Sequence, residues 1–144
     1  MNNKKLHQLI EYIDSFDPTN DRELMIPLEK YFDGNEETIC TILANTNLHI
    51  SGLGLFTRLT KLKNDERIFD IYVRFYDYQD ALEDDGSWVN SDSLYFVTSL
   101  TTEELNKELE EISPDDIWEE DDLSRFINLP DLPSGCKIIT AWWD

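Results

Sequence analysis

The feature that most constrains the fold is a run of alternating side chains at residues 67–80, R-I-F-D-I-Y-V-R-F-Y-D-Y-Q-D. Successive side chains of a β-strand point to opposite faces of its sheet, so the alternation predicts a long central strand. The face predicted to lie against the core carries Phe69, Ile71, Val73 and Phe75. The other face carries Asp70, Tyr72, Arg74, Tyr76 and Tyr78, which can cover a second layer or meet a partner.

Three further runs have the composition of strands. Residues 92–99 follow a turn at Asp85 and Gly86, which favours a hairpin with the central strand. Residues 136–143 are apolar at both sets of alternating positions, so this closing strand is predicted to be central. Residues 38–43 are short and β-branched and also predict a strand, with Cys40 as a small buried side chain.

Three segments have helical spacing of apolar side chains. Residues 3–15 predict an amphipathic helix, and Ser51 is a candidate N-cap for a helix over 51–64. The buried stripe of this second helix is predicted to contain Leu53, Phe56, Leu59, Thr60 and Leu62. A third helix over 102–112 begins at a T-x-x-E capping box.

Pro27 excludes a central strand at residues 23–32 and favours an extended stretch that leads into a short helical turn. Together these elements predict one α+β domain over residues 1–144. Its mostly antiparallel sheet includes residues 67–79, 92–99 and 136–143 and packs against about three helices.

Charge sets the class of partner. The formal net charge is −19, from 12 basic and 31 acidic residues. Such a surface repels phosphate backbones and anionic lipids, so the sequence disfavours direct binding to nucleic acid or membranes. It attracts basic proteins and cations, and the alternative is that the charge only keeps the protein soluble.

More than half of this imbalance lies in residues 103–122, which contain eleven acids and a single base, Lys107. Trp118 lies in the densest part, D-D-I-W-E-E-D-D, and an aromatic side chain among carboxylates is typical of a binding patch for a basic partner. The alternative is that Trp118 only attaches an acidic loop to the core. The candidate partner-binding residues are Asp115, Asp116, Trp118, Glu119, Glu120, Asp121 and Asp122.

No catalytic motif, cofactor motif or metal-ligand spacing is found. The oxygen-rich run at residues 33–37 lacks the spacing of a calcium loop, and Gly52 and Gly54 lack the third glycine of a nucleotide-binding loop. We therefore expect a protein that is not an enzyme and holds no cofactor or metal. The opening residues lack a secretory apolar region and no run is long enough to span a membrane, which predicts a cytoplasmic protein.

Four phrases carry a resemblance: P-L-E-K-Y-F-D-G-N at 27–35, S-D-S-L-Y-F-V-T-S at 91–99, P-D-D-I-W at 114–118 and P-S-G-C-K-I-I-T-A-W-W-D at 133–144. They resemble a group of small, acidic, largely uncharacterised bacterial proteins. In character the chain is also similar to immunity proteins of contact-dependent and polymorphic toxin systems, which bind their cognate toxin directly. This likeness implies neutralisation of a basic toxin domain such as a nuclease. The alternatives are a nucleic-acid mimic that blocks a DNA-binding protein and, third, an enzyme that uses carboxylates alone.

Overall fold

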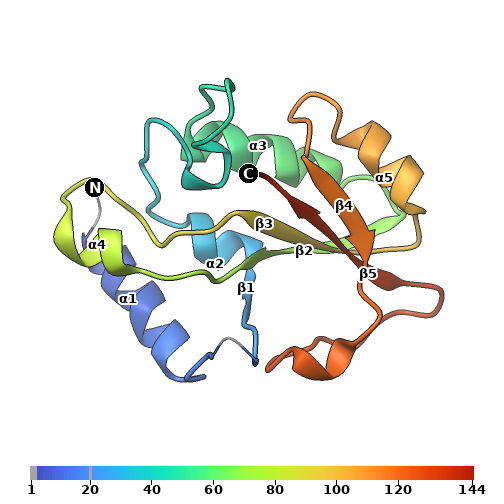
Figure 1. Cartoon of the computed structure of the whole chain (residues 1–144), viewed down its shortest axis with the longest axis horizontal. Coiled ribbons are helices and arrows are strands. Elements are labelled where there is room, and N and C mark those ends of the chain that lie inside the picture. Colours follow the sequence, from blue (N-terminus) through green and yellow to red (C-terminus); the bar gives the residue numbers. More distant parts are fainter. Residues whose placement is uncertain (1–2, 20) are drawn as a thin grey trace.

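The computed structural model describes residues 3–19 and 21–144 and contains a five-stranded antiparallel sheet of order β1-β2-β3-β5-β4. The strands are β1 (Met25–Pro27), β2 (Ile68–Arg74), β3 (Ser93–Thr98), β4 (Asp116–Glu119) and β5 (Lys137–Trp142). The helices are α1 (Asn3–Asp14), α2 (Leu28–Phe32), α3 (Gly52–Leu62), α4 (Gln79–Glu83) and α5 (Thr102–Glu108), with 3-10 turns η1 (Thr41–Leu43) and η2 (Leu123–Arg125). The predicted α+β class is confirmed (Figure 1).

Both faces of the sheet are covered, but unequally. The larger core joins one sheet face to α1, α2, α3 and α5, and its sheet side chains include Ile71, Val73, Leu94, Phe96 and Ile139. The smaller core, on the other face, contains Met25, Tyr95, Val97, Phe126 and Ile138. Figure 1 shows the η2 segment on the opposite side of the sheet from α3 and α5. The η2 segment is too short to cover the whole of its face, and the end near Trp142 stays open.

The central strand is shorter than predicted, and the prediction that Phe69 faces the core is wrong. A β-bulge between Ile68 and Asp70 shifts the register, so Ile68 enters the core and Phe69 is 57% exposed. The strand ends at Arg74, and residues 79–83 form α4 instead of continuing it. The hairpin pairing of β2 with β3 is confirmed, although its connection contains this extra helix.

Three local predictions are also corrected. Residues 38–43 form no strand, because Cys40 donates its backbone N–H to Ile50 (2.7 Å) and the chain then turns into η1. In α3 the buried stripe runs through Leu55 and Leu59, which leaves Leu53 69% exposed. The helix predicted over 102–112 ends at Glu108.

The helix caps and the central position of the closing strand agree with the predictions from the sequence. The Ser51 hydroxyl accepts the N–H of Gly54 (3.0 Å), and Thr101 and Glu104 form the predicted capping box. β5 lies between β3 and β4 and is therefore central, as predicted. Pro27 ends the edge strand β1 and caps α2. None of the helices in the described part of the chain is long and apolar enough to cross a membrane.

Trp88 closes the core and is not a surface anchor. Its side chain is fully buried, and its indole N–H donates to the carbonyl of Tyr31 (2.7 Å). The Tyr31 hydroxyl in turn donates to the carbonyl of Val89 (2.6 Å). This reciprocal pair of bonds attaches α2 to the chain that leads into β3.

Candidate protein-binding surface

Residues 116–119 of the acidic run form β4, an edge strand that pairs with β5. Its side chains alternate as the pleat requires: Ile117 packs against the larger core, while Asp116 and Trp118 lie on the opposite sheet face. On that face Trp118 stands opposite Thr140 and Asp116 stands opposite Trp142. The other edge strand, β1, is closed by the side-chain amide of Asn128, which bonds both the N–H and the carbonyl of Met25. β4 is therefore the open edge of the sheet.

Trp118 is held in one orientation although 37% of it is exposed. Its indole N–H donates to Oε2 of Glu120 (2.8 Å), which also accepts the hydroxyl hydrogen of Thr140. The other oxygen of Glu120 pairs with the guanidinium of Arg125. Because the Glu120 carboxylate has partners at both oxygens, it fixes the indole against the sheet. An exposed aromatic ring held in this way loses little entropy when a partner covers it.

Glu120 thus differs from the other acidic residues of the candidate set, because it is buried and its charge is directed inward. It supports the surface and does not form it. The carboxylates of Asp115, Asp116, Glu119, Asp121 and Asp122 are all exposed. Across residues 3–19 and 21–144, none of these five forms a salt bridge.

Three of the exposed carboxylates accept hydrogen bonds from backbone N–H groups. Asp115 accepts the N–H of Asp144 (2.7 Å), and Asp116 accepts the N–H of Ile117 (2.8 Å). Asp122 accepts the hydroxyl hydrogen of Ser124 and caps η2 by accepting the N–H of the same residue, and these two bonds lower the pKa of the Asp122 carboxyl. All three of these side chains are exposed to solvent.

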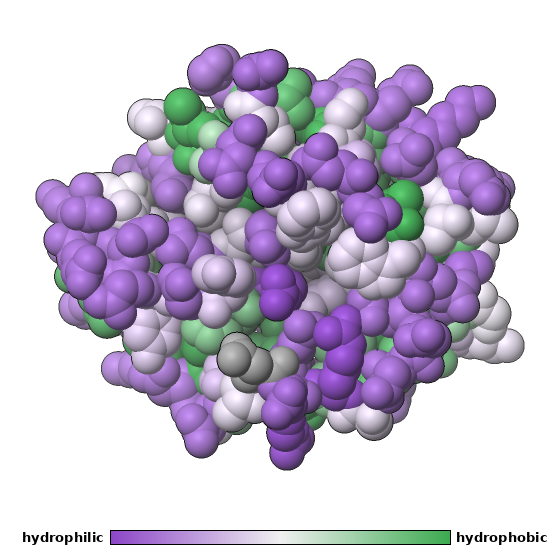
Figure 2. Space-filling model, in the orientation of Figure 1, coloured by the Kyte–Doolittle hydropathy of each residue, from purple (hydrophilic) through white to green (hydrophobic). Residues whose placement is uncertain are grey.

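The helical half of the acidic run is different, because basic side chains neutralise part of it. Arg58 of α3 pairs with Glu111, and Arg67 lies 3.7 Å from Glu104 and 3.9 Å from Glu108. Within residues 103–122, most of the carboxylates without a salt bridge therefore lie around β4. Figure 2 shows this face as mostly hydrophilic, with weakly polar side chains gathered over β4 and β5.

A hollow of about 340 Å³ lies beside Trp118 and is bounded on its other side by Trp142. Its floor is a closed set of charges: Glu23 pairs with Arg74 (3.3 Å) and with Arg125 (2.9 Å), and Arg74 also pairs with Asp92 (3.1 Å). The guanidinium groups are all committed to carboxylates, which makes the hollow unsuited to phosphate.

Tyr95 completes this floor. Its hydroxyl donates to Glu23 (2.6 Å), and burial, together with this bond, raises the pKa of Tyr95 far above its usual value. The same set of charges also orients Trp142, because its indole N–H donates to Asp92 (3.3 Å). Two tryptophan side chains, Trp118 on the edge strand β4 and Trp142 on its neighbour β5, are thus held by buried or half-buried carboxylates on the same face of the sheet.

Trp142, Arg125 and Asp92 are absent from the set of residues predicted from the sequence. Alternation along β5 does place Trp142 on the same face as Thr140, which was the available signal. The pairing of Arg125 with Glu23 joins residues about a hundred positions apart, and no sequence pattern indicates it.

In the described residues no group of three or more histidine, cysteine or acidic side chains is arranged to hold a metal ion. Burial raises the pKa of Cys40 to about 12, so its thiol stays protonated.

The fold and this surface define an α+β protein with a partly exposed tryptophan among exposed carboxylates at a sheet edge. The chain belongs to the Uncharacterized protein YfbO family, whose model matches residues 4–141. It is similar to a protein of Escherichia coli (strain K12) described as "Uncharacterized protein YfbO", with 27% identity over 126 residues, 83% of this chain and 82% of the relative. No solved structure matches the chain.

Proposed function

We propose that this protein is an immunity protein that acts in the cytoplasm and neutralises a cognate basic toxin domain, such as a nuclease. The observation that carries the proposal is the position of Trp118, fixed by Glu120 on an open sheet edge among five exposed carboxylates without salt bridges. A basic catalytic domain presents lysine and arginine side chains where it binds phosphates. Carboxylates on β4 take the place of those phosphates.

The two parts of the surface have different physical roles. Exposed carboxylates accelerate the encounter with a basic partner, because their field extends about a Debye length into solvent. A half-exposed tryptophan supplies buried apolar area at the centre of the contact and slows dissociation. Together they give the rapid and lasting capture that neutralisation of a toxin requires.

Site-specific photocrosslinking in the source cell tests the proposal. A benzophenone amino acid replaces Glu119, whose side chain is exposed on β4, and the control carries it at Glu66, which is exposed before β2. We expect an adduct at position 119 and none at position 66, and a basic partner in that adduct. The partner expressed alone should arrest growth, and co-expression of this protein should restore it.

The outcomes separate the alternatives. A partner that is harmless alone would contradict the immunity function, and a cellular DNA-binding protein released from DNA would support the nucleic-acid mimic. Equal crosslinking at both positions would contradict the β4 surface itself.

A further inference from the structure

β4 is the most exposed strand of the described sheet and lies at its edge. Three of its four residues are exposed and the fourth is half-buried, whereas every residue of β3 is buried. The other edge is covered, because the chain after η2 runs beside the residues that lead into β1: Glu23 accepts the N–H of Ile127 (2.9 Å) and donates its own to Arg125 (2.8 Å). The fold therefore covers one edge of the sheet and leaves the backbone of β4 accessible.

The pairing with β5 determines which backbone groups of β4 point outward. Glu120 donates its N–H to the carbonyl of Ile138 in β5 (2.8 Å) and continues the register of the strand. In an antiparallel pair the backbone groups of alternate residues point to the same side, so those of Trp118 also point toward β5. The N–H and carbonyl groups of Ile117 and Glu119 therefore point away from the sheet.

The two outward N–H groups of β4 differ in their partners. Asp116 accepts that of Ile117 through Oδ1 (2.8 Å), so an acidic side chain occupies part of the edge. Within residues 3–19 and 21–144, no acceptor is found for the N–H of Glu119. One donor and two carbonyl oxygens, those of Ile117 and Glu119, are thus available to an added strand.

The side chains along this edge determine which strand fits beside it. Asp116 and Trp118 lie on one face of the sheet, and Ile117 and Glu119 lie on the other. A lysine or arginine beside Trp118 stacks its stem on the indole ring and brings its charge near Asp116. An apolar side chain on the other face extends the cover over the half-buried Ile117.

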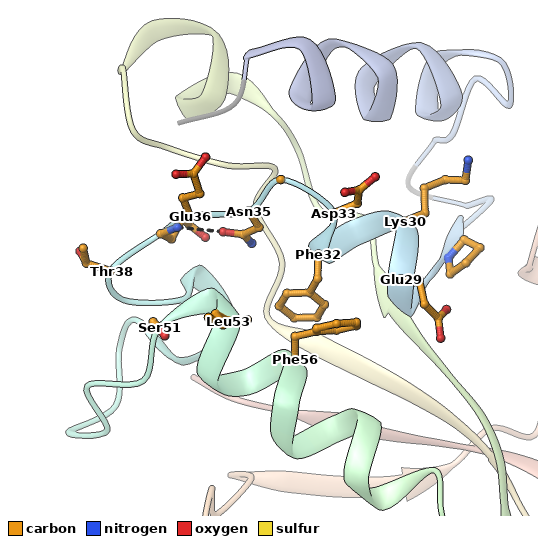
Figure 3. A pocket seen from close by; sticks show the side chains of 13 residues that line it. Glu29, Lys30, Phe32, Asp33, Asn35, Glu36, Thr38, Ser51, Leu53 and Phe56 are labelled. Carbon is orange, nitrogen blue, oxygen red and sulfur yellow. Dashed lines mark hydrogen bonds between the residues drawn. The ribbon is translucent and has the colours of Figure 1, made fainter.

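A larger hollow, of about 1010 Å³, lies between α2 and α3, where two phenylalanine rings lie one over the other with centroids 5.5 Å apart (Figure 3). Two of its carboxylates are already paired, Glu29 with Lys63 (3.0 Å) and Asp33 with Lys5 (2.8 Å). The exposed carboxylates of β4, by contrast, form no salt bridge with any described residue. Charge therefore selects an occupant at β4 and not in this hollow.

We propose that β4 receives an antiparallel strand of the basic partner, in which lysine or arginine alternates with apolar side chains. The N–H of Glu119 donates to a carbonyl of this strand, and its N–H groups donate to the carbonyls of Ile117 and Glu119. The inference rests on the proposed function for the basic character of the partner and adds the mode of contact. A second copy of this chain does not fit, because a net charge of −19 on each copy repels the other.

Hydrogen exchange of the ¹⁵N-labelled protein tests the added strand with a blocked heptapeptide that alternates lysine and valine and has lysine at both ends. We expect the amide of Glu119 to exchange about tenfold more slowly with saturating peptide, because its N–H gains an acceptor. The control is the same peptide with N-methylated valines, whose N–H groups would point toward β4. It keeps the side chains and the charge but should give no protection.

A pair of variants at position 119 separates the backbone bond from the charge. Glu119→Pro removes the outward N–H and leaves the bonds to β5, since edge strands accept proline where the N–H faces solvent. It should bind the heptapeptide about tenfold more weakly than Glu119→Gln, which loses the same charge but keeps the donor.

The proposal is overturned if the heptapeptide does not bind, if it binds without protecting Glu119, or if the two variants bind it equally. Protection of Glu119 that rises with protein concentration in the absence of peptide would assign the edge to a second copy and also overturn it. The proposed function is tested separately by the toxicity of the crosslinked partner. The added strand and the neutralisation of a toxin can therefore fail independently.

Discussion

Trp118 donates its indole N–H to the carboxylate of Glu120, two residues further along the chain, across 2.8 Å. The same carboxylate accepts from Thr140 of β5 and pairs with Arg125 of η2. One buried charge therefore connects the exposed indole ring to β5 and to the η2 segment. The acidic residues near Trp118 therefore have two roles: Glu120 is buried and stabilises the surface, whereas its neighbours are exposed to solvent.

Glu120→Ala should lower the free energy of unfolding by about 2 kcal/mol, because it leaves the donors of Trp118 and Thr140 without their acceptor and removes one of the two carboxylates that pair with Arg125. Glu119→Gln is the matched control, since its exposed side chain should change stability by less than about 0.5 kcal/mol. Urea unfolding followed by circular dichroism measures both. Equal stabilities for the two variants would show that the Glu120 network does not exist.

Val73→Asp should unfold the protein, whereas Phe69→Asp should be tolerated. Val73 is fully buried, and an unpaired carboxylate there costs several kcal/mol against a total stability of about 5–15. Phe69 lies four residues earlier, where alternation predicts the same face, but the β-bulge exposes its side chain to solvent. Thermal unfolding of both variants is the measurement, and a stable Val73→Asp protein would mean that the strand faces are reversed.

Glu37→Gln should stabilise the protein at neutral pH and have little effect in acid. Burial raises the pKa of Glu37 to about 7, against an ordinary value of 4.5. Between these values the unfolded chain loses this proton while the folded protein keeps it, so folding stability falls as pH rises from 4.5 to 7. Glutamine avoids this loss and keeps an oxygen for the N–H of Thr41.

The difference in unfolding free energy between Glu37→Gln and the parent should grow from near zero at pH 4.5 to about 1–3 kcal/mol above pH 7. Urea titrations across this range measure it, with the exposed Glu36→Gln variant as the control. A difference that stays constant with pH would contradict the assigned burial of Glu37.

The sequence predicts regular elements well where a local pattern determines them. The capping box at Thr101 and the two-sided apolar pattern of β5 are set by neighbours within a few residues, and both are confirmed. The bulge at Ile68 depends on how β3 pairs with β2, so alternation alone misplaces Phe69. The sequence does not indicate β4, because acidic side chains are rare in strands and the strand depends on non-local pairing with β5.

The candidate surface was predictable in its charge and in Trp118. Its internal support was not, because the contacts of Arg125, Glu23 and Arg74 join three separate parts of the chain. The burial of Glu120 could not be predicted for the same reason. In the sequence it is one acid among several, and its pairing with Arg125 of η2 appears only in the fold. Composition reports charge, and only the fold determines which charges are paired.

Trp118→Ala should weaken the complex with the partner crosslinked at position 119 mainly by speeding its dissociation. Loss of a central aromatic side chain costs about 2 kcal/mol or more, which corresponds to a dissociation rate about thirtyfold higher. Surface plasmon resonance measures the rate, and Leu82→Ala, an exposed change on α4, is the control. An unchanged dissociation rate would show that Trp118 does not contact the partner.

The most direct test of the β4 surface is the association rate of a variant in which Asp115, Asp116 and Asp121 become asparagine and Glu119 becomes glutamine. Each amide keeps a carbonyl oxygen, so residues 115 and 116 can still accept the backbone N–H groups of Asp144 and Ile117, and the fold should be intact. The account predicts association about tenfold slower at low salt, and a smaller difference at physiological ionic strength because salt screens the parent's charges. Association as fast as the parent's at both salt concentrations would contradict it, since the acidic edge would then serve only solubility.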